Sequence, residues 1–202
     1  MGLWNRVFAA AYDPVLAGAE RKGLAAARRS LLAGARGRVL EIGAGTGLNL
    51  PYYPAGVDLV LTEPDPAMAK RLRRRRDVTR ASADNLPFPD ATFDTVVSTL
   101  VFCTVPDLPR ALCDVRRVLK PSGQLLFLEH VRAEPGSKLE RWQDRLHRPW
   151  HALACGCNCN RDFLAALQDA GFSTSEVVRH EWRFMPVIVR PVVIGAASFP
   201  AS

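Results

Sequence analysis

Short runs of apolar residues alternate along this chain with segments in which apolar residues recur every three or four positions. The runs predict buried strands, and the recurring pattern predicts helices that bury one face. Five strands are expected first, at residues 38–42, 57–62, 78–81, 93–98 and 124–130. Helices are expected between them at residues 66–76 and 108–119. This alternation predicts a doubly wound, mostly parallel sheet covered by helices on both faces, a three-layer αβα fold.

The pattern changes after residue 130. A helix is expected over residues 137–151, then a cysteine-rich loop, then a helix over residues 162–170. Asp162 would begin that last helix, because a carboxylate is favoured at the positive end of a helix. Two strand-like runs, 176–182 and 187–196, predict an antiparallel C-terminal hairpin that brings the sheet to seven strands.

The composition is that of one globular domain. The 202 residues are 48% hydrophobic, which suffices for one sizeable core. No apolar run reaches the ~20 residues of a membrane-spanning helix, since Arg190 and Pro191 interrupt the most apolar tail. Asp13 and Pro14 interrupt the N-terminal apolar patch before it could serve as a secretory signal. The five cysteines, an odd number, fit a reducing compartment, so we expect a cytoplasmic protein.

The formal net charge of +7 permits attraction to anionic partners but does not determine the fold. Much of the positive excess lies in residues 70–76, on the helix expected after the second strand. Charge runs of this kind are usually solvated, and we interpret this run as a solvent-facing helix surface.

The most specific motif is the turn after the first strand, where Glu41 is followed by glycines at 43, 45 and 47. Glycine permits both a sharp turn and close approach of a ligand to the backbone, because it has no β-carbon. The dinucleotide-binding spacing G-x-G-x-x-G would require a third glycine where Leu48 stands. The observed spacing, E-x-G-x-G-x-G, therefore points away from a nicotinamide cofactor.

With this spacing the chain resembles the class I S-adenosylmethionine-dependent methyltransferases, in particular the type 11 group. The resemblance implies a single domain over residues 1–202. Its helical cap would span residues 1–36 and its Rossmann-like core residues 37–202. The resemblance implies S-adenosyl-L-methionine as the cofactor and places Glu41 near its methionine end. Glu63 ends the second strand, where the family carboxylate accepts from both ribose hydroxyls. Enzymes that use NAD place an acid similarly, so Glu63 alone does not separate the two.

A second phrase, residues 83–94, resembles the family's adenine-side loop, and Pro121-Ser122-Gly123 resembles its turn before the fifth strand. Relatives often place an acid before the alanine, but Ser82 stands there, and Asp84 is the candidate substitute. The predicted cofactor-binding residues are Tyr12, Glu41, Gly43, Ala44, Gly45, Gly47, Asn49, Glu63, Pro64, Met68, Ala83, Asp84, Asn85, Thr99 and Leu100.

An apolar stripe at helical spacing precedes the first strand. It comprises Leu3, Trp4, Val7, Phe8, Ala11, Tyr12 and Val15. Three interpretations stay open: the stripe packs against the domain, it caps the cofactor, or it makes a peripheral contact with the inner membrane surface.

The acceptor side is expected after the fourth and fifth strands. The predicted catalytic residues are Cys103, His130 and Arg161. His130 could act as a base or orient a thiolate, and a structural role at the strand end is the alternative. A thiol acceptor with a pKa of about 8.5 needs only partial ionisation near a cation, whereas a carbon or hydroxyl acceptor needs a positioned base.

The phrase at residues 127–131, with Trp142, Trp150 and the cysteine loop, resembles the thiol methyltransferases of eukaryotic membranes and their bacterial relatives. This resemblance implies a small or lipophilic thiol as the acceptor. Phospholipid and quinone methyltransferases share most of these phrases, so a lipid amine or a quinone is the alternative. No N-P-P-Y-like motif follows the fourth strand, so no nucleic-acid partner is expected.

A metal site was weighed and not predicted. The array considered was His147, His151, Cys155, Cys157 and Cys159. Structural zinc sites separate paired cysteines by two to four residues, whereas C-x-C-x-C does not form a tetrahedron unaided. A module that binds the cofactor without catalysis also stays open, since the glycine loop and Glu63 serve binding alone.

Overall fold

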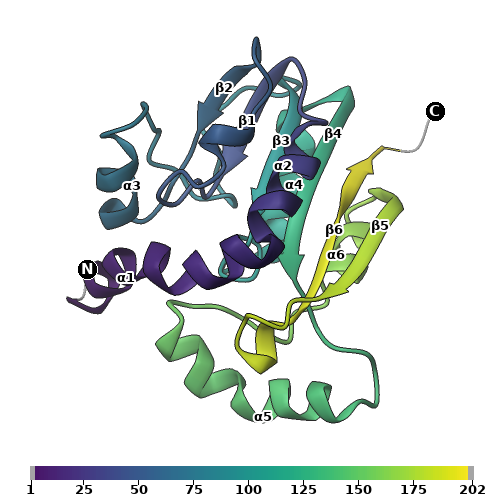
Figure 1. Ribbon diagram of the computed structural model, residues 1–202. Coiled ribbons are helices and arrows are strands. Elements are labelled where there is room, and N and C mark those ends of the chain that lie inside the picture. Colours follow the sequence, from purple (N-terminus) through teal and green to yellow (C-terminus); the bar gives the residue numbers. More distant parts are fainter. Residues whose placement is uncertain (1–2, 200–202) are drawn as a thin grey trace.

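The computed structural model describes residues 3–199 (Figure 1). Its sheet has the strand order β2-β1-β3-β4-β6-β5. The strands are β1 (Arg38–Ile42), β2 (Asp58–Leu61), β3 (Phe93–Thr99), β4 (Leu119–His130), β5 (Ser173–Glu181) and β6 (Pro191–Ser198). The pairs among β1 to β4 are parallel, and β6 is antiparallel to both β4 and β5. Five strands therefore run in one direction and β6 alone runs in the other, as expected for a mostly parallel sheet with a C-terminal hairpin.

The prediction of seven strands was wrong, because the described residues form six. The expected strand at residues 78–81 makes a single bridge, in which Thr79 pairs with Thr62. Thr79 donates to the carbonyl of Leu61 at 2.9 Å, and its own carbonyl accepts from Glu63 at 3.1 Å. The backbone then turns into a bridge between Ser82 and Asn85, so the ladder ends after one residue.

Helices cover both faces of this sheet. The N-terminal helices are α1 (Leu3–Ala19) and α2 (Ala25–Leu32), joined by a π-helical turn η1 (Glu20–Leu24) with a kink at Lys22 and Gly23. The later helices are α3 (Pro66–Leu72), α4 (Leu108–Val118), α5 (Lys138–Leu153) and α6 (Phe163–Asp169), with 3₁₀ turns η2 (Leu50–Tyr52) and η3 (Val187–Val189). Asp162 caps α6 as predicted, accepting from the backbone of Ala165 at 3.1 Å.

The alternation along the strands sorts the core into two layers. Leu40 and Phe127 point to the face covered by α4 and α6, where they join the larger buried cluster. Their neighbours Val39 and Leu126 point to the opposite face and pack with Leu32 at the end of α2. Since successive residues of a strand face opposite sides, the three-layer arrangement follows directly from these apolar runs.

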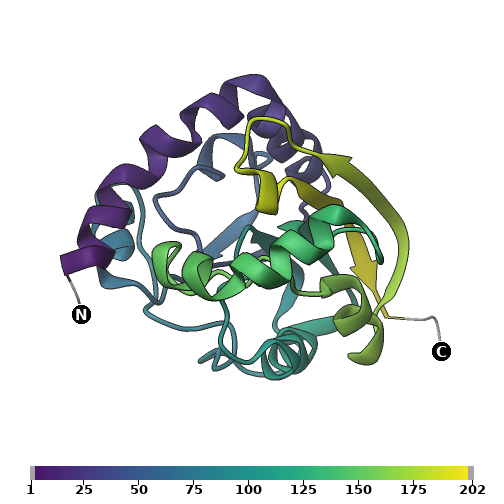
Figure 2. The ribbon, with the colours of Figure 1, turned by 90° about the horizontal axis from the view of Figure 1, so that it is seen from below.

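The buried face of the N-terminal helix is not the predicted apolar stripe. Ala9 and Leu16, which lie outside the stripe, are buried, whereas Trp4, Val7 and Val15 of the stripe are exposed. Figures 1 and 2 show α1 and α5 at the end of the sheet where the parallel strands terminate. Trp4 donates from its indole nitrogen to the carbonyl of Leu153 at 3.1 Å, which joins the two helices. Over residues 3–199, every helix falls short of the length or the apolar character that crossing a bilayer requires.

Candidate active site

The glycine loop after β1 holds three glycines in the left-handed region, with φ of 57°, 57° and 85° at Gly43, Gly45 and Gly47. A β-carbon at Gly43 would lie 2.7 Å from Val101, and one at Gly47 would lie 2.8 Å from Leu50 and Leu72. A β-carbon at Gly45 would meet only a backbone oxygen at 4.0 Å. Two glycines are therefore required by packing, whereas Gly45 borders open space at the carboxyl edge of the sheet.

Glu63 joins the loops that follow β1 and β2. One carboxylate oxygen accepts from the backbone of Gly45 at 2.8 Å, and the other accepts from Asp65 at 2.8 Å. Burial raises the pKa of Glu63, against these two hydrogen bonds. Each oxygen keeps a further lone pair, which suits a ribose diol. Next to it Pro64 is exposed, and Met68 of α3 is buried.

Glu41 is buried and hydrogen-bonded to two side chains of the protein. Its two carboxylate oxygens accept from Asn49 at 2.8 Å and from the Tyr53 hydroxyl at 2.9 Å. Burial raises its pKa from 4.5 to about 7, although both hydrogen bonds oppose this shift. Glu41 therefore orients Asn49, and through Asn49 it supports the loop rather than presenting a bare carboxylate.

Arg28 is the site residue that sequence reasoning missed. Its guanidinium is buried and donates to Glu20 at 3.0 Å and to Asn49 and Thr99, both at 2.8 Å. Leu24 and Leu32, one turn before and after Arg28, are both buried. The sequence spacing could have predicted this burial, because an arginine four residues from a leucine on either side shares one helix face with both.

The exit of β3 is held by a second buried acid. Glu129 accepts from the Ser98 hydroxyl at 2.6 Å and from the backbone of Val101 at 3.0 Å. Leu100, between them, has φ of 61°, a left-handed conformation that non-glycine residues rarely adopt. Such backbone outliers are retained where surrounding contacts enforce them, often at functional sites. The carboxylate of Glu129 thus holds the backbone that carries Thr99 and Leu100 at the end of β3.

The predicted adenine-side residues also reach this edge. The backbone of Asn85 donates to Ser82 at 3.1 Å, which closes a tight turn around Ala83 and Asp84. This turn follows directly after Thr79, whose carbonyl accepts from Glu63. Ala83 through Asn85 therefore lie a few residues along the chain from the backbone that pairs with Glu63.

Helix α1 lies over these loops. The Thr46 hydroxyl of the glycine loop donates to Asp13 at 2.5 Å, and Asn5 donates to Asp65 at 3.2 Å. Burial raises the pKa of Tyr12 to about 12, and its hydroxyl interacts electrostatically with Arg28 and Cys103. Of the three interpretations of the N-terminal stripe, the structure gives α1 direct contacts with the loops after β1 and β2.

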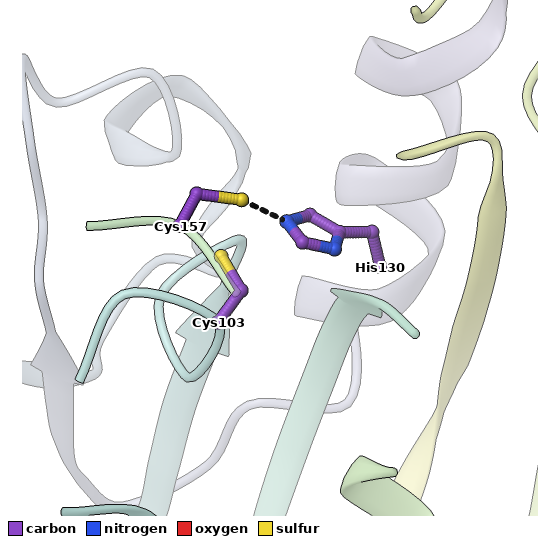
Figure 3. Close-up of side chains that lie close together, drawn as sticks. All are labelled: Cys103, His130 and Cys157. Carbon is purple, nitrogen blue, oxygen red and sulfur yellow. Dashed lines mark hydrogen bonds between the residues drawn. The ribbon is translucent and has the colours of Figure 1, made fainter. Parts of the chain in front are cut away.

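On the acceptor side, Cys103, His130 and Cys157 converge from the loop after β3, the end of β4 and the loop after α5 (Figure 3). The Cys157 sulfur lies 3.1 Å from His130 Nε2 and accepts from the Trp150 indole nitrogen at 3.0 Å. The neighbouring Cys103 thiol lowers the pKa of Cys157, and the same pairing together with burial raises the pKa of Cys103. Among the described residues, His130 Nδ1 is buried without a hydrogen-bond partner.

Arg161 supports this cluster through backbone contacts. Its guanidinium donates to the carbonyls of Phe102 and Val105, the latter at 2.8 Å, and burial lowers its pKa. Asn158 donates to the carbonyl of Cys103 at 3.0 Å. The prediction brought Cys103, His130 and Arg161 to one region, and the structure places all three there, with Arg161 holding the loop that carries Cys103.

The cysteine and histidine array of the sequence does not assemble as a unit. His147 hydrogen-bonds Asn158 at 2.9 Å, and the Cys159 thiol donates to the carbonyl of Gln143 at 3.7 Å. Cys157 alone joins Cys103 and His130 within 4.8 Å. Its partners lie 54 and 27 residues earlier in the chain, so spacing within the loop could not reveal them.

The methyltransferase domain family model matches residues 40–127, which include the glycine loop, Glu63 and the turn at residues 83–85. Human thiol S-methyltransferase TMT1A is 32% identical over 98% of this chain and 89% of its own length. The chain belongs to the class I S-adenosylmethionine-dependent methyltransferases. Phosphatidylethanolamine N-methyltransferase of Cereibacter sphaeroides matches this methyltransferase at 31% identity over 57% of the chain and 64% of its own length.

A solved structure supports the same fold. The methyltransferase superimposes on a SAM-dependent methyltransferase from Thermotoga maritima with a TM-score of 0.72 and 23% identity, covering 98% of this chain and 97% of the other. The enzyme uses S-adenosyl-L-methionine, and the loops after β1 and β2 fit such a ligand, because Gly45 leaves open space beside the carboxylate of Glu63. The prediction of the cofactor and of the reaction class is confirmed.

Proposed function

We propose that this methyltransferase transfers the methyl group of S-adenosylmethionine to the sulfur of a small lipophilic thiol. One observation carries the proposal: similarity to a thiol S-methyltransferase extends over 98% of the chain and so includes the cysteine loop and the C-terminal hairpin. Similarity to the phospholipid enzyme covers only 57%. The similarity to the thiol enzyme therefore takes in the acceptor-side segments together with the common core.

The proposed cofactor contacts follow the geometry of the loops after β1, β2 and β3. Glu63 accepts from the ribose hydroxyls with its free lone pairs, and the backbone at Gly45 lies against the ligand. Asn49 and Thr99, fixed by Arg28, face the methionine end, and the turn at Ala83 to Asn85 borders the adenine. The remaining predicted residues, Tyr12, Gly43, Ala44, Gly47, Pro64, Met68 and Leu100, complete the lining.

The bound cofactor supplies an electrophilic methyl group on a sulfonium, so the protein needs to align the acceptor sulfur and exclude water. Arg161 acts as a positioning residue, because its two carbonyl contacts hold the loop of Cys103. Cys103 and His130 border the acceptor. Helix α1 excludes water from above the loops that it contacts.

A labelled-methyl assay tests the proposal. The purified enzyme is offered aliphatic and aromatic thiols, phosphatidylethanolamine and demethylmenaquinol at equal concentration. Transfer to thiols at a rate well above that to the two lipids is the expected result. Cofactor binding by calorimetry without turnover on any acceptor would favour the binding module, and quenching of NADH fluorescence would favour a nicotinamide enzyme.

A lipid acceptor is the second candidate, and the outer surface of α1 favours it. Trp4, Val7 and Val15 are exposed along this helix. A groove of about 730 Å³ between α1 and α3 is lined by five basic residues, Arg6, Lys70, Arg71, Arg74 and Arg75. Exposed apolar side chains beside basic ones are typical of helices that lie at an anionic membrane surface. Residues 70–76 are exposed as expected apart from buried Leu72, but the helix expected over residues 66–76 ends at Leu72, so residues 73–76 lie beyond it.

We further propose that the enzyme acts in the cytoplasm, at the inner membrane surface. The five free cysteines support a reducing compartment. Sedimentation with vesicles of phosphatidylglycerol and phosphatidylcholine tests the surface contact. Replacing Trp4 and Val15 by Ser should reduce binding several-fold, whereas Val178→Ser, at an exposed position on β5, should not. Equal binding of all three proteins would contradict the contact.

A further inference from the structure

The Cys103, His130 and Cys157 cluster contains the ligand set of a soft metal ion. Its three ligand atoms lie within 4.8 Å of one another, and all three residues are buried. They come from three separate elements, and neither sulfur is in a disulfide. Buried polar groups are normally satisfied by hydrogen bonds, but His130 Nδ1 is buried without a partner among the described residues, so the imidazole beside two thiols requires an explanation beyond packing.

The spacing of these atoms suits tetrahedral coordination. Zinc binds sulfur at about 2.3 Å and nitrogen at about 2.0 Å, so tetrahedral ligand atoms lie roughly 3.4 to 3.8 Å apart. The Cys157 sulfur and His130 Nε2 are 3.1 Å apart, and a shift of a few tenths of an ångström would admit the ion. The Trp150 indole already donates to the Cys157 sulfur, as an outer partner of a metal-bound thiolate would.

Three protein ligands leave one position of a tetrahedron free, which distinguishes catalytic zinc sites from structural ones. Cys103 lies three residues after Leu100, and its thiol donates to the Leu100 carbonyl at 3.7 Å. The cluster therefore borders the segment that carries Thr99 and Leu100, two of the proposed cofactor contacts.

We propose that Cys103, His130 and Cys157 bind one zinc ion, whose fourth position binds the sulfur of the acceptor thiol. This inference rests on the proposed thiol methyltransferase function and assigns His130 as a ligand rather than as the base. The acceptor thiol loses its proton to water. Its sulfur electron pair then forms the new S–CH₃ bond, and the bond between the methyl group and the donor sulfonium breaks onto the donor sulfur.

Metal analysis of the full-length enzyme, purified without chelator and then incubated with zinc chloride and desalted, tests the site. About one zinc ion per chain is expected. Cys103→Ala, Cys157→Ala and His130→Asn should each weaken zinc binding by more than about a hundredfold, and Trp150→Phe by about tenfold. The controls Cys113→Ala and Cys155→Ala, which change an exposed and a half-buried thiol, should retain one zinc. Cofactor binding by calorimetry shows which variants remain folded.

Substituting cobalt for zinc tests the metal site independently, through its absorption spectrum. The cobalt-loaded enzyme should show sulfur-to-metal charge-transfer absorption, which should increase when 2-mercaptoethanol adds a third sulfur ligand. A folded wild-type enzyme with no bound zinc and no cobalt spectrum would overturn the inference, as would a mass two daltons low from a Cys103–Cys157 disulfide in the enzyme as isolated. Thiol methylation by a zinc-free enzyme would refute the metal site alone. Zinc binding without thiol methylation would refute the proposed acceptor instead.

Discussion

Replacing Gly45 by alanine separates ligand contact from packing in the glycine loop. The added β-carbon would have no neighbour closer than the Gly43 carbonyl oxygen at 4.0 Å, so the free protein has room for it. The left-handed φ of 57° costs a non-glycine residue about 1 to 2 kcal/mol of folding stability. Because the methyl group would occupy the open side of the loop, we expect the dissociation constant for the cofactor to rise at least about tenfold, or about 1.4 kcal/mol.

Gly56→Ala is the matched control. Gly56 has φ of 89°, and a β-carbon there would meet nothing within 4 Å, in a turn before β2. The backbone cost should therefore be similar, while cofactor affinity should be unchanged. Gly43→Ala should instead act mainly by lowering the free energy of unfolding, since its β-carbon would lie 2.7 Å from Val101.

Urea unfolding and calorimetry with S-adenosylhomocysteine measure the two quantities separately. We expect Gly45→Ala and Gly56→Ala to lose comparable unfolding free energy, and only Gly45→Ala to lose affinity. Wild-type affinity in Gly45→Ala, or in the bulkier Gly45→Val, would show that the ligand does not approach this turn. The assignment of the cofactor site to the glycine loop would then be refuted.

Three further predictions concern the buried charges. Glu63→Gln should weaken cofactor binding about 10- to 100-fold in calorimetry, since it removes charge-assisted hydrogen bonds, and unchanged affinity would contradict the ribose contact. The pKa of Glu41 rises from 4.5 to about 7 on folding, so its contribution to stability is complete below pH 4.5 and is lost, by about 3 kcal/mol of unfolding free energy, as the pH rises through 7. Urea unfolding at pH 5 and 8 should show this loss in the wild type and not in Glu41→Gln. An equal change in unfolding free energy in the two proteins would refute this prediction. Arg28→Leu should cost about 3 to 5 kcal/mol of unfolding free energy because it leaves Glu20 without its partner. The control Arg29→Gln, at an exposed position, should cost less than about 1 kcal/mol. Equal losses in the two variants would contradict a stabilising role for the buried contacts of Arg28.

Local pattern determined much of the fold. Apolar runs at residues 38–42 and 93–98 placed β1 and β3 within one residue, since a strand buried on both faces needs a continuous apolar run. Asp162 was predicted to begin α6 and caps it. The strand predicted at residues 78–81 was wrong. The length of a strand depends on whether a neighbouring backbone continues beside it, and here the pairing ends at Thr79.

The sequence by itself indicated the cofactor class through its resemblance to the family, because the glycine spacing after β1 and the motif at residues 83–94 are each contained in one short stretch of chain. Only the tertiary structure decided that Arg28 is buried against Thr99, and that Cys103 and His130 meet Cys157. These contacts depend on the order and register of the strands and on where the loop after α5 packs. Residues far apart in the chain become neighbours through that packing, which no local spacing encodes.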